Sequence, residues 1–312
     1  MTRQAPEVAI LQTTLPDYRR EFVAELDRRL AGGLVVLAGD DFFDPSVRTR
    51  AADGRVHVRV RNHYFLGRRL LWQAGCWRTV LDARVAVIEA NPRILSSWLM
   101  LALRRALGRR TLLWGHVWSR SRRNGIGRRL RHLMRALGSG LIAYTETEAG
   151  LLRAEHAQPV TAAPNALYRH DEMGAGARQP GADGQFICVG RLVAEKKPAV
   201  LLEAFIACAS DLGERTLAFV GDGPLRGDLE SRAAAAGVGD RVVFTGHLAD
   251  PAALRGLYHG AVASVSPGAT GLSMIQSLAF GVPMIYSRDE RHGPEIEAGV
   301  IGWNCLTFDS PD

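Results

Sequence analysis

The chain has 312 residues, of which 47% are hydrophobic and 23% are charged, so its composition excludes an intrinsically disordered protein. It has four cysteines without CxxC spacing and no apolar run of about 18 residues, so neither a disulfide framework nor a membrane-spanning helix is expected. Without a recognisable secretory signal, a reduced, cytoplasmic compartment is the expectation, with Cys188 and Cys208 buried inside apolar runs.

The net charge of +7 is divided unevenly along the chain. Residues 1–165 carry 27 Arg against 14 acidic residues, a balance of +13, whereas residues 166–312 carry 12 basic against 18 acidic residues, a balance of −6. This asymmetry suggests two units with different partners, the basic one facing an anionic surface or substrate. Codon bias in a GC-rich genome would produce the same excess of arginine.

Short apolar runs alternate with helical patterns through the whole chain. Before residue 166, strands are expected at 8–13, 33–39, 58–60, 84–90, 110–115 and 140–145, and helices at 18–30, 96–107 and within 119–138. After residue 184, strands are expected at 186–190, 216–221, 241–246, 261–267 and 283–287, and helices at 197–210, 225–236, 251–259 and from 272. The alternation predicts an α/β protein with two tandem Rossmann-like, doubly wound domains facing across a cleft, 1–165 and 185–312, joined by a Gly-rich linker at 166–184.

Lys196 and Lys197 are the only lysines, since the other 37 basic residues are arginine. They follow an apolar strand that ends at Gly190 and a turn that carries Arg191. Ligands of doubly wound sheets bind at the carboxyl ends of strands near helix N-termini, where an Arg and a Lys can clamp a diphosphate. A solvated basic turn is the alternative, and Lys197 is expected to be an exposed neighbour.

Three further glycine-rich turns follow, "FVGDGPL" (219–225), "FTGHL" (244–248) and "SPGATGLSMIQSLAFGVPMI" (266–285). With "VGRLVAEKK", their order resembles the C-terminal domain of the retaining GT-B glycosyltransferases of family 4 (glycosyl transferases group 1), in a subgroup that assembles polysaccharides or lipid-linked glycans. The resemblance covers 186–307 well and extends loosely over the first domain through "LPDYRREF", "NPRILSSW", "WGH" and "AYTETEAGLL".

The resemblance implies a GT-B fold in which Arg191 and Lys196 bind the diphosphate of a nucleotide-sugar. Lys197 falls where the family often has glycine. The other implied donor-binding residues are Gly190, Gly221, Gly223, His247, Leu248, Ala269, Thr270, Gly271, Leu272 and Gln276. No cofactor and no tightly bound metal are implied, because basic side chains and helix dipoles neutralise the charge.

One departure from the family pattern concerns two glutamates eight positions apart, which fall on Gly268 and Gln276. Gln276 can still accept a hydrogen bond from the nucleotide ribose. Gly268 has no side chain, so the donor sugar would be held by backbone N–H groups of 269–272 or by another residue. The departure fits a subgroup variant or a catalytically impaired, nucleotide-sugar-binding partner subunit.

The first domain lacks the G-x-G-x-x-G fingerprint after its first strand, which argues against a dehydrogenase and assigns this domain to the acceptor. His116 directly follows a strand, and the resemblance suggests that it contacts the donor sugar or the departing diphosphate, with a structural histidine as the alternative. Arg19 and Arg20 are acceptor-site candidates, and a solvated helix start would explain them equally.

The basic segment 119–138 has an apolar helical stripe, formed by Ile126, Leu130, Leu133, Met134 and Leu137, with most arginines off it. Such a helix fits an anionic membrane surface or a lipid-diphosphate acceptor, or packs on the core with a solvated arginine face. Nucleic-acid binding is not expected, because no aromatic residues alternate with the charges. The acidic run "GDDFFDPS" (39–46) is explained by turn chemistry, and no His/Cys/Asp metal set is recognised.

Together with these patterns, the resemblance implies a metal-independent hexosyltransferase, cytoplasmic or peripheral on the inner face of the membrane. It implies transfer of a hexosyl unit from a nucleoside-diphosphate sugar to a glycan or lipid-linked hydroxyl, with retention. A nucleotide-sugar epimerase on the same fold is the alternative. A chain that ends at "NCLTFDSPD" is expected to lack the terminal helices of the second domain.

Overall fold

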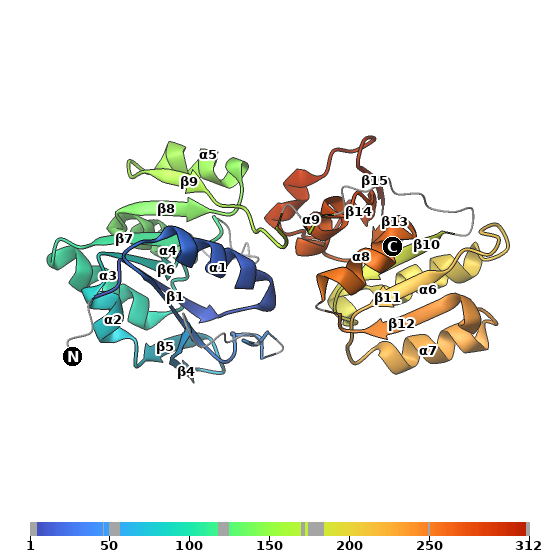
Figure 1. Ribbon diagram of the computed structural model, residues 1–312, viewed down its shortest axis with the longest axis horizontal. Helices are drawn as coiled ribbons and strands as arrows, with labels where there is room; N and C mark the ends of the chain where they lie inside the picture. Colours follow the sequence, from blue (N-terminus) through green and yellow to red (C-terminus); the bar gives the residue numbers. More distant parts are fainter. Residues whose placement is uncertain are drawn as a thin grey trace. The chain divides into compact units, whose positions relative to one another are not determined.

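A computed structural model describes residues 5–45, 47–49, 57–117, 125–169, 172–173, 184–248 and 250–309. The chain divides into two compact units, Met1–Ala166 and Leu167–Asp312 (Figure 1). Each unit contains a parallel sheet with helices on both faces, which confirms the predicted fold class of two Rossmann-like domains. Of the linker predicted at 166–184, residues 170–171 and 174–183 lie outside the described part of the chain.

Unit 1 is built on a parallel sheet in the order β3-β2-β1-β6-β7-β8-β9. Its strands are β1 (Val8–Thr14), β2 (Leu34–Gly39), β3 (His57–Arg59), β6 (Val85–Glu89), β7 (Arg110–Trp114), β8 (Gly140–Ala143) and β9 (Val160–Ala162). The central strands are apolar on both faces because both faces are covered. Since the six expected strands all form, the apolar runs predicted this sheet correctly, and only β9 was not anticipated.

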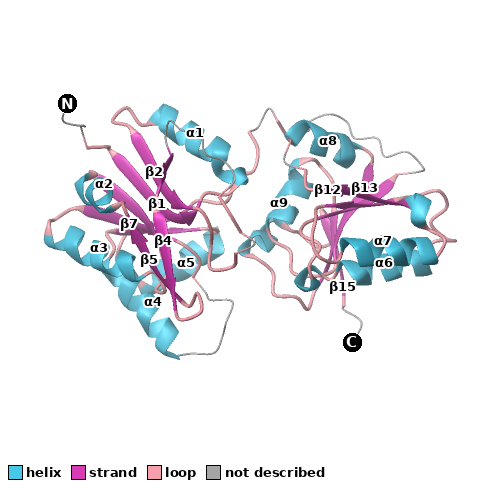
Figure 2. Ribbon diagram, turned by 90° about the horizontal axis from the view of Figure 1, so that it is seen from below, coloured by secondary structure: helices cyan, strands magenta, loops and turns pink. Residues whose placement is uncertain are grey.

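The helices of unit 1 cover the two faces unequally. They are the 3-10 turn η1 (Asp17–Arg19), α1 (Arg20–Arg29), α2 (Trp77–Asp82), α3 (Leu95–Ala106), α4 (Gly125–Leu137) and α5 (Glu146–Glu155). Apolar residues of α1 pack with Ile10 and Val36 on one face. The helices α2 to α5 pack with Leu11 and Leu37 on the other face (Figure 2). A hairpin of β4 (Arg61–Phe65) and β5 (Leu70–Ala74) was not predicted.

Arg104 shows that arginine also serves the core of unit 1. It lies on α3, is fully buried, and donates to Thr111 Oγ1 and to the carbonyls of Val80, Leu81, Ala83 and Arg110. Burial, assisted by the charge of Arg109, lowers the pKa of Arg104 to about 10. The side chain therefore ties α2, α3 and β7 together through hydrogen bonds to backbone carbonyls.

Unit 2 contains a parallel sheet in the order β12-β11-β10-β13-β14-β15. Its strands are β10 (Gln185–Val189), β11 (Leu217–Val220), β12 (Val242–Gly246), β13 (Ala261–Ser266), β14 (Met284–Ser287) and β15 (Cys305–Phe308). Its helices are α6 (Pro198–Ala207), α7 (Arg226–Ala235), α8 (Pro251–His259) and α9 (Leu272–Ala279), with the 3-10 turns η2 (Ala194–Lys196), η3 (Gly239–Arg241) and η4 (Pro294–Ala298). Strand order reverses between β10 and β13. In doubly wound sheets, ligands bind outside the strand ends at such a reversal.

Several detailed expectations change. Cys208 is exposed at the end of α6, because that helix stops at Ala207, before the predicted 210. The acidic residues Asp40 and Asp41 pair with Arg59 and Arg68, so they are accounted for without a metal ion. Within the described residues, no helix combines the length and the apolar character needed to cross a bilayer. Residues 118–124, at the start of the basic segment, are outside the described part of the chain.

Candidate donor site and the strand ends of unit 1

The loop after β10 forms a pocket in unit 2. Arg191 and Lys196 both line it, with Gly190, Ser266 and Ser273 among the other lining residues. Lys196 Nζ donates to the carbonyl of Ala269, in the turn that leads into α9. The structure therefore brings the two predicted cations together beside the turn that the sequence associated with the donor sugar.

Glycine is required here because backbone approaches backbone. The Gly190 N–H donates to Val220 O at 3.0 Å, and a Cβ on Gly221 would lie 1.9 Å from Gly190 O. A Cβ on Gly223 would lie 2.3 Å from Leu192 O. The predicted glycines thus hold the loops after β10 and β11 against each other, which leaves backbone groups to line the crevice.

Gly268 lies against η2. A Cβ at this position would be 2.4 Å from Glu195 O and 2.6 Å from the carbonyl carbon of Lys196. Gly268, at the position of a family glutamate, therefore packs directly against the backbone of η2. A side chain fits at this position only if η2 moves.

Lys197 is not the exposed neighbour that we expected. Its φ of 49° is left-handed, the conformation that explains glycine at this family position. Its Nζ lies 2.5 Å from Glu290 Oε1, and its side chain is half-buried. The two lysines consequently have separate tasks, one in the pocket and one in an ion pair.

The turn from Ala269 to Leu272 is fixed by a histidine that the sequence did not reveal. The N–H of Thr270 donates to His292 Nδ1 at 3.2 Å, and the N–H of Gly293 donates to Thr270 O at 2.7 Å. Burial lowers the pKa of His292, which favours the neutral ring that can accept this bond. The Thr270 N–H, one of four assigned to the donor sugar, is therefore engaged within the protein.

A carboxylate also lies beside this turn. Glu295 Oε2 is 3.4 Å from the position that a Cβ on Gly271 would occupy. Glu295 belongs to η4, 27 residues beyond Gly268 in the chain. The distance in sequence is why motif comparison did not find it.

Gln276 lies between two tyrosines. Its Oε1 accepts from Tyr258 Oη at 3.3 Å, and its Nε2 donates to Tyr168 Oη. An amide oxygen has two lone pairs, so one remains for a ribose hydroxyl. Near this network Leu248 packs on the apolar cluster around Tyr258, whereas His247 is exposed at the end of β12.

In unit 1, His116 follows β7 and its side chain is half-exposed. Its Nδ1 lies 3.6 Å from Glu148 Oε1, and its ring packs on Tyr144 with centroids 4.3 Å apart. Burial acts to raise the pKa of Glu148, but hydrogen bonds from His116 and from the backbone of Val117 and Tyr144 outweigh it and lower that pKa. The charged carboxylate orients the imidazole and leaves Nε2 as the nitrogen for a ligand.

Arg19 and Arg20 occupy different environments. Arg20 is exposed on the first turn of α1, whereas Arg19 is buried with its guanidinium carbon 4.2 Å from the Trp114 ring centre. Nη2 of Arg19 donates to Tyr144 Oη at 2.8 Å, while Nε and Nη1 have no hydrogen-bond partner among the described residues. Burial opposes the charge, but Tyr144 and Tyr18 raise the pKa, so Arg19 stays protonated. Arg19 is thus no solvated helix start.

Comparison with solved structures places the chain in the GT-B fold. HepE of Anabaena, solved with UDP and glucose, has a TM-score of 0.64 at 14% identity, over 98% of this chain and 86% of that one. The lipopolysaccharide outer core galactosyltransferase WaaB has a TM-score of 0.59 at 14% identity, over 97% and 85%. UDP-GlcNAc 2-epimerase of Methanocaldococcus jannaschii has a TM-score of 0.58 at 11% identity, over 97% and 88%.

The sequence comparison is more specific for unit 2. Residues 183–311 match the family model described as glycosyl transferases group 1. A GDP-mannose-dependent alpha-(1-6)-phosphatidylinositol dimannoside mannosyltransferase of Mycobacterium tuberculosis is 35% identical over 102 residues, which are 32% of this chain. The match spans 26% of the length of that curated relative.

Proposed function

We propose that the chain is a glycosyltransferase that moves a hexosyl unit from a nucleoside-diphosphate sugar to a hydroxyl on a glycan or lipid-linked acceptor, with retention. The observation that carries the proposal is the pocket after β10, where Arg191 and Lys196 meet the turn that begins at Gly268. The family match of residues 183–311 supports it. GDP-mannose is the first donor to test, because a curated enzyme named for it is 35% identical to this chain over 102 residues.

In the proposed reaction, the bond between the anomeric carbon and the diphosphate oxygen breaks while the acceptor oxygen attacks from the same face. The acceptor proton passes to the leaving phosphate oxygen, and the products are the glycoside and the nucleoside diphosphate. Arg191 offers a planar fork to the diphosphate, and Lys196 offers an ammonium with three donors, of which Ala269 O takes one. These cations supply the charge neutralisation without a tightly bound metal ion.

The remaining predicted residues receive roles within this scheme. Gln276, held by Tyr168 and Tyr258, accepts from the ribose, and Glu295 supplies the carboxylate for the donor sugar that Gly268 lacks. His116, oriented by Glu148, contacts the sugar or the departing diphosphate. Arg19, with two unpaired donors, binds an anionic group of the acceptor.

The acceptor side of the proposal includes an anionic membrane surface. Met134 of α4 is buried, but Ile126, Leu130 and Leu133 are exposed beside the exposed Arg128 and Arg129. The neighbouring helix α3 and its C-cap add exposed leucines at four-residue spacing, namely Leu95, Leu99, Leu103 and the C-cap Leu107. Such a basic, apolar surface suits the interface of an anionic bilayer. In a flotation assay, the protein should float with phosphatidylglycerol vesicles and not with phosphatidylcholine vesicles. An Arg128→Ser/Arg129→Ser variant should not float with either.

The donor proposal is tested first by ligand binding and then by turnover. A thermal-shift panel of UDP, GDP, ADP and their sugars should show one nucleotide that stabilises the fold, by about 2.7 kcal/mol at 100 times its dissociation constant. Arg191→Ala and Lys196→Ala should each remove about 2–4 kcal/mol of transition-state stabilisation, a loss of about 30- to 1,000-fold in turnover. Arg232→Ala, which removes two exposed ion pairs, with Asp228 on α7 and Glu203 on α6, is the matched control.

The products separate this function from its alternatives. Transfer to an acceptor with a nucleoside diphosphate as second product supports the proposal. Release of an epimerised sugar nucleotide without acceptor would indicate the epimerase, whose fold the chain also resembles. Nucleotide binding without transfer or donor hydrolysis would indicate a non-catalytic subunit. Near-wild-type turnover in both alanine variants would refute the assigned roles of Arg191 and Lys196.

A further inference from the structure

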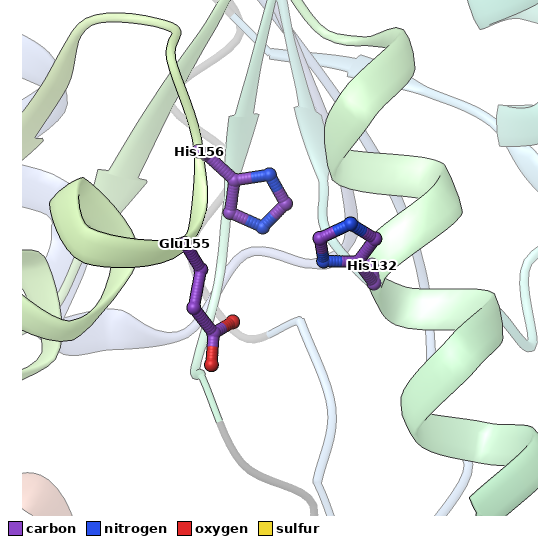
Figure 3. A group of neighbouring side chains, drawn as sticks. All are labelled: His132, Glu155 and His156. Carbon is purple, nitrogen blue, oxygen red and sulfur yellow. The ribbon is translucent and has the colours of Figure 1, made fainter.

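Two histidines and a glutamate meet in unit 1, outside every residue assigned above. His132 lies on α4, Glu155 is the last residue of α5, and His156 follows it as the C-cap. Each residue offers one ligand atom, and the three atoms lie within 4.8 Å of one another. In Figure 3 the two rings and the carboxylate point toward a common space. No metal-binding spacing is visible in the sequence, because 22 residues lie between His132 and Glu155.

The two elements that carry these side chains are already fixed to each other. Gln158 Nε2 donates to the carbonyls of Arg135 and Ala136, at 3.2 Å each, and of Gly138, at 3.4 Å. The backbone of His156 is held by Leu152 O at 2.9 Å. Ligand atoms around a tetrahedral ion lie about 3.3 Å apart. Side-chain rotations that move the three ligand atoms by about 1 Å are therefore enough to form the site.

The side chain of His156 provides an independent indication of a ligand site. Its Nε2 is buried and has no hydrogen-bond partner among the described residues. A buried, unpaired polar nitrogen costs free energy, which a coordinated ion would recover.

We propose that His132, Glu155 and His156 bind one divalent transition-metal ion of the Zn²⁺ class, with water in the fourth position. Two imidazoles and one carboxylate are a ligand set for such ions. The nearby charge of Arg135 disfavours Mg²⁺ and Ca²⁺, which rely on carboxylate charge, more than ions that bind nitrogen strongly. The ion clips α4 to α5 and takes no part in the glycosyl transfer proposed above.

The test uses the full, tag-free chain with Cys208→Ser, which removes the one exposed thiol among the described cysteines. Zn²⁺ is titrated in competition with a chromophoric chelator, and Co²⁺ is followed by its visible absorption. We expect one saturable site with a tetrahedral Co²⁺ spectrum, and a rise in Tm when Zn²⁺ is added. His132→Ala and His156→Ala should each weaken binding by at least about 100-fold, and Glu155→Gln by about 10-fold.

The control is His63→Ala, which removes an exposed histidine on β4 and should leave Zn²⁺ affinity unchanged. Tm measured without metal identifies any variant that folds poorly. If the two histidine variants fold poorly, the Zn²⁺ affinity of Glu155→Gln tests the proposal instead, and an affinity equal to that of the wild type would overturn it. No saturable one-to-one binding, or equal affinity in the wild type and in folded His132→Ala and His156→Ala, would overturn the proposal.

Discussion

Substituting Gly268 tests whether the donor turn depends on backbone contact or has merely lost a glutamate. A Cβ at this position lies 2.4 Å from Glu195 O, whereas an ordinary contact is about 3.4 Å, so the η2 turn must shift by about 1 Å. Overpacking of this kind costs about 1–3 kcal/mol of unfolding free energy. Because the displaced turn carries Lys196, Gly268→Ala and Gly268→Glu should both bind nucleotide more weakly and turn over more slowly.

The measurements are thermal unfolding, nucleotide titration and product formation on the same preparations. Gly256→Ala in α8 is the matched control. Apart from the helix's own backbone and the adjacent residues, no atom of the described residues lies within 4 Å of the Cβ position, and alanine should stabilise that helix by about 0.5–1 kcal/mol. Gly271→Ala should be milder than Gly268→Ala, because its Cβ meets only ordinary contacts near Glu295. The reasoning fails if Gly268→Ala matches wild type, or if Gly268→Glu is more active than wild type.

Three further substitutions test individual structural features. Lys197→Gly should keep or raise Tm, because it relieves the left-handed φ of 49°. Lys197→Val should lower the unfolding free energy by about 1–2 kcal/mol. Equal Tm values in these two variants would contradict this reasoning. Glu148 has a pKa below its ordinary 4.5, so its contribution is present above that pH and is lost as pH falls through the lowered value. Glu148→Gln should therefore flatten the decline in Tm on acidification, and an unchanged Tm-versus-pH curve would count against the ionised carboxylate. Arg104→Lys should cost about 3 kcal/mol in urea unfolding, since a lysine cannot satisfy its four carbonyl partners, and a loss below about 1 kcal/mol would be inconsistent with that network.

The strands that the sequence predicted well are those buried on both faces. Residues 8–11 of β1 and the whole of Leu217–Val220 are apolar, because helices cover both sides of a parallel sheet. The β4–β5 hairpin was missed because its strand Arg61–Phe65 is largely polar and half-exposed, and its turn, with Leu66 and Arg68 at positive φ, lacks a recognisable hairpin dipeptide.

The residues of the candidate site also divide into those that the sequence predicted and those that it did not. Arg191 and Lys196 were predictable because they lie within one short strand-to-helix turn. Glu295 and His292 reach the donor turn from a later loop, and only three-dimensional contact reveals them. For Arg19, only the alternative of a solvated helix start was wrong, because its burial against Trp114 has no signature in the local sequence.

Because lysine is scarce in this chain, the donor pocket can be labelled selectively through its lysine. An amine-selective acylating reagent has only Lys196, Lys197 and the chain's α-amino group to modify. Lys196 lines the pocket, and Lys197 is held by Glu290, so the two ε-amines differ in what shields them. A ligand in the pocket should therefore protect Lys196 from acylation. Peptide mapping of Lys196 could then measure ligand binding in a mixture and without a radiolabelled sugar.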